Sequence, residues 1–143
     1  PFVAKVYGTN KMFIIYFVTG SVGFVISCLA GVKLTIGASG AICGLIGATL
    51  YFGKSRGGFF GDAVYRQTMG WVIGIGVLGL LVPNINNWGH GGGLVSGIAA
   101  AWLLGYNGQR PENILHKAAG ILLFLITIGL LLWRVLAGIG LLV

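Results

Sequence analysis

Charged side chains are scarce in this chain, since Asp, Glu, Lys and Arg together make up 8% of its 143 residues. An ordinary soluble domain carries about 25% charged residues, so there is too little charge here to solvate a surface. Soluble, disordered and coiled-coil proteins are therefore excluded. Hydrophobic residues make up 57% of the chain and its mean hydropathy is +0.97, which is typical of an integral membrane protein.

Cysteine and metal-binding residues are few as well. The two cysteines, Cys28 and Cys43, both lie in apolar runs, so the sequence predicts two small core residues and neither a disulfide framework nor a zinc site. The chain contains no phosphate-binding loop, no dinucleotide fingerprint and no cluster of metal ligands. We therefore expect no metal and no organic cofactor. The chain begins at Pro1 without Met or a signal peptide, which predicts a fragment of a longer protein.

Charge-free runs locate the membrane-spanning segments, because about 20 apolar residues cross a bilayer. The sequence predicts an all-α, polytopic transmembrane helix bundle. Its spans are expected at about 12–31, 38–53, 67–82, 89–106 and 118–142. The third and fourth spans are separated by a polar cluster, Pro83-Asn84-Ile85-Asn86-Asn87, in which Asn86 is favoured as a helix cap. The other connections are short except for 54–66 and 107–117, so neighbouring helices should be antiparallel.

The distribution of basic residues predicts the orientation. With alternating spans, Lys33 lies alone on one face, while the opposite face carries seven cations: Lys5, Lys11, Lys54, Arg56, Arg66, Arg110 and Lys117. Lys and Arg collect on the cytoplasmic side, so Pro1 starts there and Lys33 faces outward. The basic loops are expected to meet anionic lipid rather than nucleic acid. Arg134, within the last span, either reaches the outer surface, which we favour, or pairs inside the bundle.

Glycine is abundant, with 27 residues, and many recur on one helix face. The second span carries Gly40, Gly44 and Gly47, the third Gly70 and Gly74, and the fourth Gly93 and Gly97. Small residues four apart let helix backbones approach closely in lipid. The pattern predicts that the second and fourth spans touch through their glycine faces.

Two polar residues then fall at similar depth on the outer side. Ser39 starts the second span and His90 starts the fourth. A serine and an imidazole within hydrogen-bond reach form a nucleophile and base, the minimum for acyl transfer. The glycines beside Ser39, Gly37 and Gly40, leave room for a substrate backbone, and the N–H groups at that helix start could bind an oxyanion. Taken singly, each residue is better explained otherwise: the serine as a packing residue bonded to its own helix, and the histidine as a capping or interfacial group.

These segments resemble a known family. The tract Gly37-Ala38-Ser39-Gly40-Ala41-Ile42-Cys43-Gly44-Leu45-Ile46-Gly47 resembles the nucleophile helix of the rhomboid intramembrane serine proteases. Asn87-Trp88-Gly89-His90-Gly91-Gly92-Gly93-Leu94-Val95-Ser96-Gly97 resembles their histidine helix, and Val6-Tyr7-Gly8 the entry to their third helix. The resemblance covers roughly residues 1–106. It implies a rhomboid core over 1–106, a basic cytoplasmic loop over 107–117 and an additional transmembrane helix over 118–143.

The resemblance also implies a function. Ser39 is the expected nucleophile and His90 the general base of a Ser–His dyad that cleaves transmembrane or membrane-anchored proteins through an acyl-enzyme. Gly37, Gly40 and Asn87 are expected near the oxyanion and the substrate backbone, although Asn87 could instead be a cap. Gly44, Gly47, Gly93 and Gly97 are expected to pack helices. A bacterial plasma membrane fits the compactness and charge asymmetry, and the oligomeric state stays open.

Two departures from the family pattern leave alternatives. The family's His-x-x-x-Asn motif and its first two helices are missing, which truncation explains. Loss of an oxyanion donor costs about a hundred- to a thousandfold in rate, so an inactive fragment is one expectation. Cys43 stands where many members carry an aromatic residue that stacks on the catalytic histidine; as a nucleophile itself it is disfavoured. A non-catalytic rhomboid-like protein that binds transmembrane helices is the main alternative. A small transporter or channel with Ser39, His90 and the asparagines on a polar path is the other.

Overall fold

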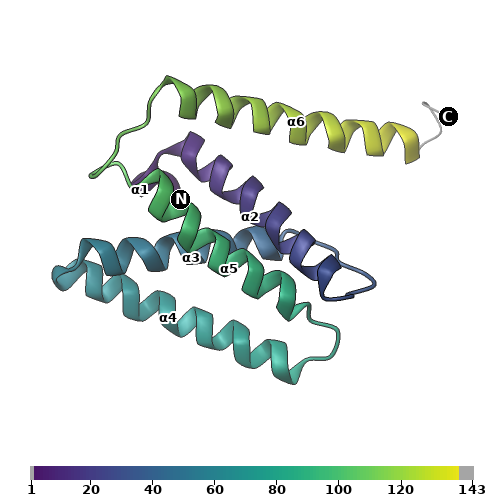
Figure 1. Ribbon diagram of the computed structural model, residues 1–143, viewed down its shortest axis with the longest axis horizontal. Coiled ribbons are helices and arrows are strands. Elements are labelled where there is room, and N and C mark those ends of the chain that lie inside the picture. Colours follow the sequence, from purple (N-terminus) through teal and green to yellow (C-terminus); the bar gives the residue numbers. More distant parts are fainter. Residues whose placement is uncertain (1, 139–143) are drawn as a thin grey trace.

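All regular elements are helices in the computed structural model, which describes residues 2–138. The six helices are α1 (Phe2–Tyr7), α2 (Thr9–Leu29), α3 (Ser39–Arg56), α4 (Gly58–Leu81), α5 (Asn87–Leu104) and α6 (Ile114–Gly138). Helix α6 covers one side of α2 (Figure 1). Helices α3 and α5 lie at the centre of the bundle, and α4 packs on the far side of α3 (Figure 1). The prediction of an all-α bundle is confirmed.

Three helices are long and apolar enough to cross a membrane, namely α2, α4 and α6, with 21, 24 and 25 residues. Helices α3 and α5 have 18 residues each, or about 27 Å at 1.5 Å per residue. A larger share of their residues is buried than in α2, α4 or α6. The chain is thus an integral membrane protein, and the crossing of the membrane by α3 and α5 stays a prediction.

Some predicted boundaries are wrong. The long connection expected over 54–66 is a single residue, Gly57, because α4 begins at Gly58. Gly57 and Gly58 have φ values of 61° and 68°, a left-handed conformation that glycine adopts without strain and that lets the chain reverse at once. Helix α6 begins at Ile114 instead of about 118, while the predicted residues 139–142 and the placement of Pro1 lie outside the described residues.

Helix α1, which the hydropathy pattern did not reveal, completes an apolar cluster at one end of the bundle. The cluster comprises Val3, Tyr7, Ile15, Ala48, Phe52 and Ala101. Tyr7 is fully buried and its hydroxyl donates to the carbonyl oxygen of Ala48 at 2.9 Å. A buried hydroxyl needs a hydrogen-bond partner, and this bond joins α1 to α3.

Helices α3 and α5 run parallel and pack through glycines. A Cβ built at Gly93 would overlap the carbonyl oxygen of Gly40, and one at Gly97 would overlap that of Gly44. One turn further along α3, a Cβ at Gly47 would overlap the carbonyl oxygen of Leu94. The small residues therefore allow a backbone approach that any side chain would prevent.

Other small residues have different surroundings from those expected. Gly70 and Gly74 on α4 face open space, with no atom within 4 Å of a built Cβ, so α4 meets no neighbouring helix there. Of the two cysteines, Cys43 is buried as predicted, whereas Cys28 is exposed. Cys28 lies in an apolar run but on an outer surface of α2. In a membrane protein the outward faces are apolar too, so an apolar run does not by itself predict burial.

A polar cluster closes the end of the bundle opposite Ser39. Lys11, expected on the basic cytoplasmic face, is fully buried, and its ammonium donates to the carbonyl oxygens of Leu104, Gly105 and Arg110. Leu104 is the last residue of α5, where backbone acceptors lack helical partners, and Gly105 and Arg110 follow the helix. The Lys11 backbone N–H in turn donates to Glu112 Oε1 at 3.0 Å. The 105–113 connection is therefore fastened to α2.

Candidate functional site

Ser39 and His90 lie in the first turns of the two central parallel helices. Ser39 is the first residue of α3 and is exposed, and His90 lies one turn into α5 and is half-buried. Both side chains line one cavity of about 860 Å³, together with Lys33, Asn84, Asn86, Asn87 and Trp88. The two packed helices thus bring residues 51 positions apart to a common polar space.

The start of α3 offers free backbone donors. Its N-cap, Ala38, makes no side-chain hydrogen bond to the helix, so the N–H groups of Gly40 and Ala41 lack the partner that a polar cap would give them. These groups and the helix dipole favour a negative charge beside Ser39. Gly37 has a φ of 96° and open space around it, whereas a Cβ at Gly40 would lie 3.2 Å from the Gly89 carbonyl oxygen.

One imidazole nitrogen of His90 is buried and has no hydrogen-bond partner among the described residues. Its backbone N–H donates to the carbonyl oxygen of Asn86 at 3.1 Å. Among the described residues, its Nδ1 is buried without a hydrogen-bond partner, and no hydrogen bond joins the imidazole to Ser39. Buried polar atoms are usually paired, so among the described residues the imidazole has acceptor or donor capacity that no protein group uses.

The two asparagines before His90 have different roles. Asn86 is the N-cap of α5, and its Oδ1 accepts from the Gly89 N–H at 3.0 Å, which confirms the cap expected from the sequence. Asn87 Nδ2 donates to the carbonyl oxygen of Gly79 at 2.7 Å and so joins α5 to the end of α4. Asn87 also lines the polar cavity, where its expected contact with an oxyanion stays a prediction.

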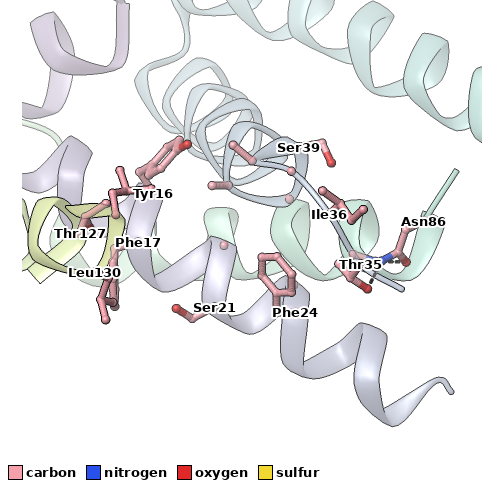
Figure 2. A pocket seen from close by; sticks show the side chains of 18 of the residues that line it. Tyr16, Phe17, Ser21, Phe24, Thr35, Ile36, Ser39, Asn86, Thr127 and Leu130 are labelled. Atoms are coloured by element: carbon pink, nitrogen blue, oxygen red, sulfur yellow. Dashed lines mark hydrogen bonds between the residues drawn. The ribbon is translucent and has the colours of Figure 1, made fainter. Parts of the chain in front are cut away.

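Two apolar cavities adjoin the polar one. One, of about 330 Å³, lies between α2, α6 and the segment before α3, with Ser39 at one end and Arg134 also in its lining (Figure 2). The other, of about 380 Å³, lies between α3, α4 and α5, where Cys43 and His90 are both lining residues. Cys43 and His90 thus border the same apolar space.

The cavity contains no acidic side chain. In the part of the chain that the structure describes, no three His, Cys, Asp or Glu residues gather as metal ligands. Glu112 is engaged by Lys11 and Asn10 at the opposite end. A carboxylate to orient His90 is therefore missing from the lining, and the chemistry available to these residues is that of a serine, an imidazole and backbone donors.

Comparisons with known proteins agree with the motifs. The sequence matches the Rhomboid domain family over residues 1–107. It is 36% identical over 109 residues to the rhomboid protease GluP of Bacillus subtilis (strain 168), a match that covers 72% of this chain and 20% of that protein. The chain thus spans about a fifth of the length of this relative. No solved structure matches the chain significantly.

Proposed function

This chain belongs to the rhomboid family, and we propose that it carries the Ser39–His90 dyad of an intramembrane serine endopeptidase. The observation that supports this most is the shared cavity of Ser39 and His90, placed by two parallel helices whose glycine contacts fix their spacing. The substrates are transmembrane or membrane-anchored proteins, and the site opens toward the outer face of a bacterial plasma membrane.

The first half of the reaction forms an acyl-enzyme. His90 accepts the hydroxyl proton of Ser39 while Ser39 Oγ attacks the carbonyl carbon of the scissile peptide bond. The negative charge that develops on the carbonyl oxygen is stabilised by the free N–H groups of Gly40 and Ala41 at the start of α3. His90 then gives its proton to the departing amine, and the peptide bond breaks.

The second half regenerates the enzyme. A water molecule from the polar cavity loses a proton to His90 and attacks the ester carbon, and Ser39 leaves with that proton. The bond between Ser39 Oγ and the acyl group breaks, and the product leaves with a new carboxyl end. The substrate must unwind locally beforehand, because a transmembrane helix keeps its carbonyls in internal hydrogen bonds.

Cleavage of a reporter with one transmembrane segment tests this function. In membranes, the intact protein should cleave the reporter, and Ser39→Ala and His90→Ala should each lower the rate by about a thousandfold or more, since the two side chains act as one unit. Ser96→Ala is the matched control, because Ser96 Oγ donates only to the carbonyls of Gly92 and Gly93 in its own helix. Cleavage that survives Ser39→Ala contradicts the proposal.

A non-catalytic role in binding transmembrane helices is the second candidate. It is favoured by Cys43, a small residue that lines a cavity with His90 where many family members carry an aromatic residue, and by the missing His-x-x-x-Asn motif. In that case the wild-type protein would not cleave the reporter, and Ser39→Ala would leave the capture of partner helices unchanged.

A further inference from the structure

Asn86 joins three parts of the chain at the outer end of the bundle. Its Nδ2 donates to Ser27 Oγ on α2 at 2.7 Å. The same Nδ2 donates to Thr35 Oγ1 at 3.0 Å (Figure 2). Its Oδ1 and its backbone oxygen accept from the N–H groups of Gly89 and His90. Both amide protons and both oxygens are therefore engaged, and a fully paired amide of this kind holds its partners in one geometry.

The connection to α2 is close-packed as well as hydrogen-bonded. Ser27 Oγ is fully buried and donates onward to the carbonyl oxygen of Gly23 at 2.7 Å. A Cβ at Gly89 would lie 3.0 Å from both Ser27 Oγ and Asn86 Nδ2. The start of α5 is thus fixed against α2 at the level of His90, and a side chain larger than hydrogen at Gly89 would force it away.

Thr35 brings the same amide to the segment that carries the nucleophile. It lies four residues before Ser39 in an irregular stretch, and within residues 33–37, all described, its bond to Asn86 is the one hydrogen bond to another element. The following Gly37, with a φ of 96°, adds no restraint of its own because glycine turns freely. Without Thr35, this stretch would be held only at its two ends.

We infer that Asn86 is a positioning residue that holds the Ser39 segment, through Thr35, in register with His90 at the start of α5. Asn86 itself touches no reacting atom. The inference rests on the proposed Ser39–His90 chemistry, because its consequence is the distance between nucleophile and base. The reaction rate depends steeply on that distance, because a displacement of about 1 Å can lower the rate about a hundredfold.

The test changes the hydrogen bond between Asn86 and Thr35 and leaves the N-cap of α5, which Asn86 also forms, in place. Thr35→Val keeps the side-chain shape but removes the acceptor of the Asn86 amide, whereas Thr35→Ser keeps a hydroxyl. Thr49→Val is the matched control, since Thr49 Oγ1 donates only to Leu45 of its own helix at 2.9 Å. The intact protein and each variant are reacted with a fluorophosphonate, and backbone amide exchange is followed over residues 33–38.

Thr35→Val should lower the labelling rate by about ten- to a hundredfold and speed amide exchange over 33–38, with KM for a reporter substrate and the melting temperature nearly unchanged. Thr35→Ser should restore both properties, and Thr49→Val should leave both as in the wild type. Labelling and exchange in Thr35→Val that equal those of the wild type overturn the inference. A wild-type protein that does not react overturns the proposed function instead, and the exchange data alone then decide whether Asn86 holds the segment.

Discussion

Two glycines that look alike in the sequence have opposite surroundings. Gly97 on α5 lies against the backbone of Gly44 so closely that a Cβ would overlap its carbonyl oxygen, while Gly74 on α4 has open space around it. The first glycine is required by packing, and the second only weakens its helix, since glycine is about 1 kcal/mol less favourable than alanine there.

Alanine at these two positions should therefore change stability in opposite directions. Gly97→Ala should lower the free energy of unfolding by about 1–3 kcal/mol, because the α3–α5 contact must open. Gly74→Ala should raise it by about 0.5–1 kcal/mol through helix propensity alone. Unfolding followed by circular dichroism in detergent measures both. Equal effects of the two substitutions would contradict the described packing of α5.

At the scale of helices, the buried Lys11 fastens the end of α5 to the start of α2. Lys11→Met keeps the length of the side chain but leaves three carbonyl oxygens without their donor, so unfolding should become easier by about 2–4 kcal/mol. Lys117→Met is the control, because Lys117 is exposed and surface charges contribute little. Thermal unfolding of the two variants measures the difference, and similar melting temperatures would show that the Lys11 contacts carry no stability.

Glu112 makes the same junction sensitive to acid. Burial alone raises the pKa of Glu112, but hydrogen bonds from the Lys11 backbone and from Asn10, with the Lys11 charge, outweigh it and hold that pKa below its usual value. A lowered pKa stabilises the folded state above the ordinary Glu pKa, and this contribution is lost as the pH falls through the lower, folded value.

Stability of the wild type should accordingly decline as the pH falls below the ordinary range for Glu, and Glu112→Gln should flatten that decline. Melting temperatures between about pH 6 and pH 3 measure the effect, with the unfolded reference near pH 4.3. Asp62→Asn serves as the control, since Asp62 is exposed. An acid-induced decline of the same size in Glu112→Gln would contradict this role of Glu112.

The sequence predicts helices well where apolar runs are long and poorly where structure depends on distant polar contacts. Charge-free runs locate α2, α3, α5 and the start of α6 to within a few residues. They miss the start of α4 at Gly58, because Asp62 and Arg66 interrupt the apolar pattern although the helix continues through them. A helix can extend beyond the hydrocarbon region, so charge marks the membrane edge rather than the end of the helix.

In the candidate site, too, local features could be predicted from the sequence and distant polar contacts could not. Ser39, His90 and the cap Asn86 could be selected from local sequence, because each stands at a helix start beside glycines. The links of Asn86 to Ser27 and Thr35 could not, since those partners lie 59 and 51 residues away. A hydroxyl that accepts a distant amide proton leaves no periodic or local pattern, so only the fold reveals it.

At the scale of the whole molecule, the charge distribution predicts a single orientation. Lys33 lines the cavity of Ser39 and His90, while Lys117 lies in the first turns of α6, at the opposite end. In a variant without native cysteines, Lys33→Cys should react with an impermeant maleimide in right-side-out vesicles, and Lys117→Cys should react only after permeabilisation. The reverse result would place the cavity on the cytoplasmic side.

The central claim is that the fold makes Ser39 a reactive nucleophile with His90 as its base. Fluorophosphonate labelling of the intact protein in detergent, followed by mass mapping of the modified peptide, tests this most directly. The account predicts a single adduct on Ser39 that disappears in Ser39→Ala and in His90→Ala but persists in Ser96→Ala. A folded wild-type protein without an adduct, or an adduct that persists in His90→Ala at the wild-type rate, would contradict it.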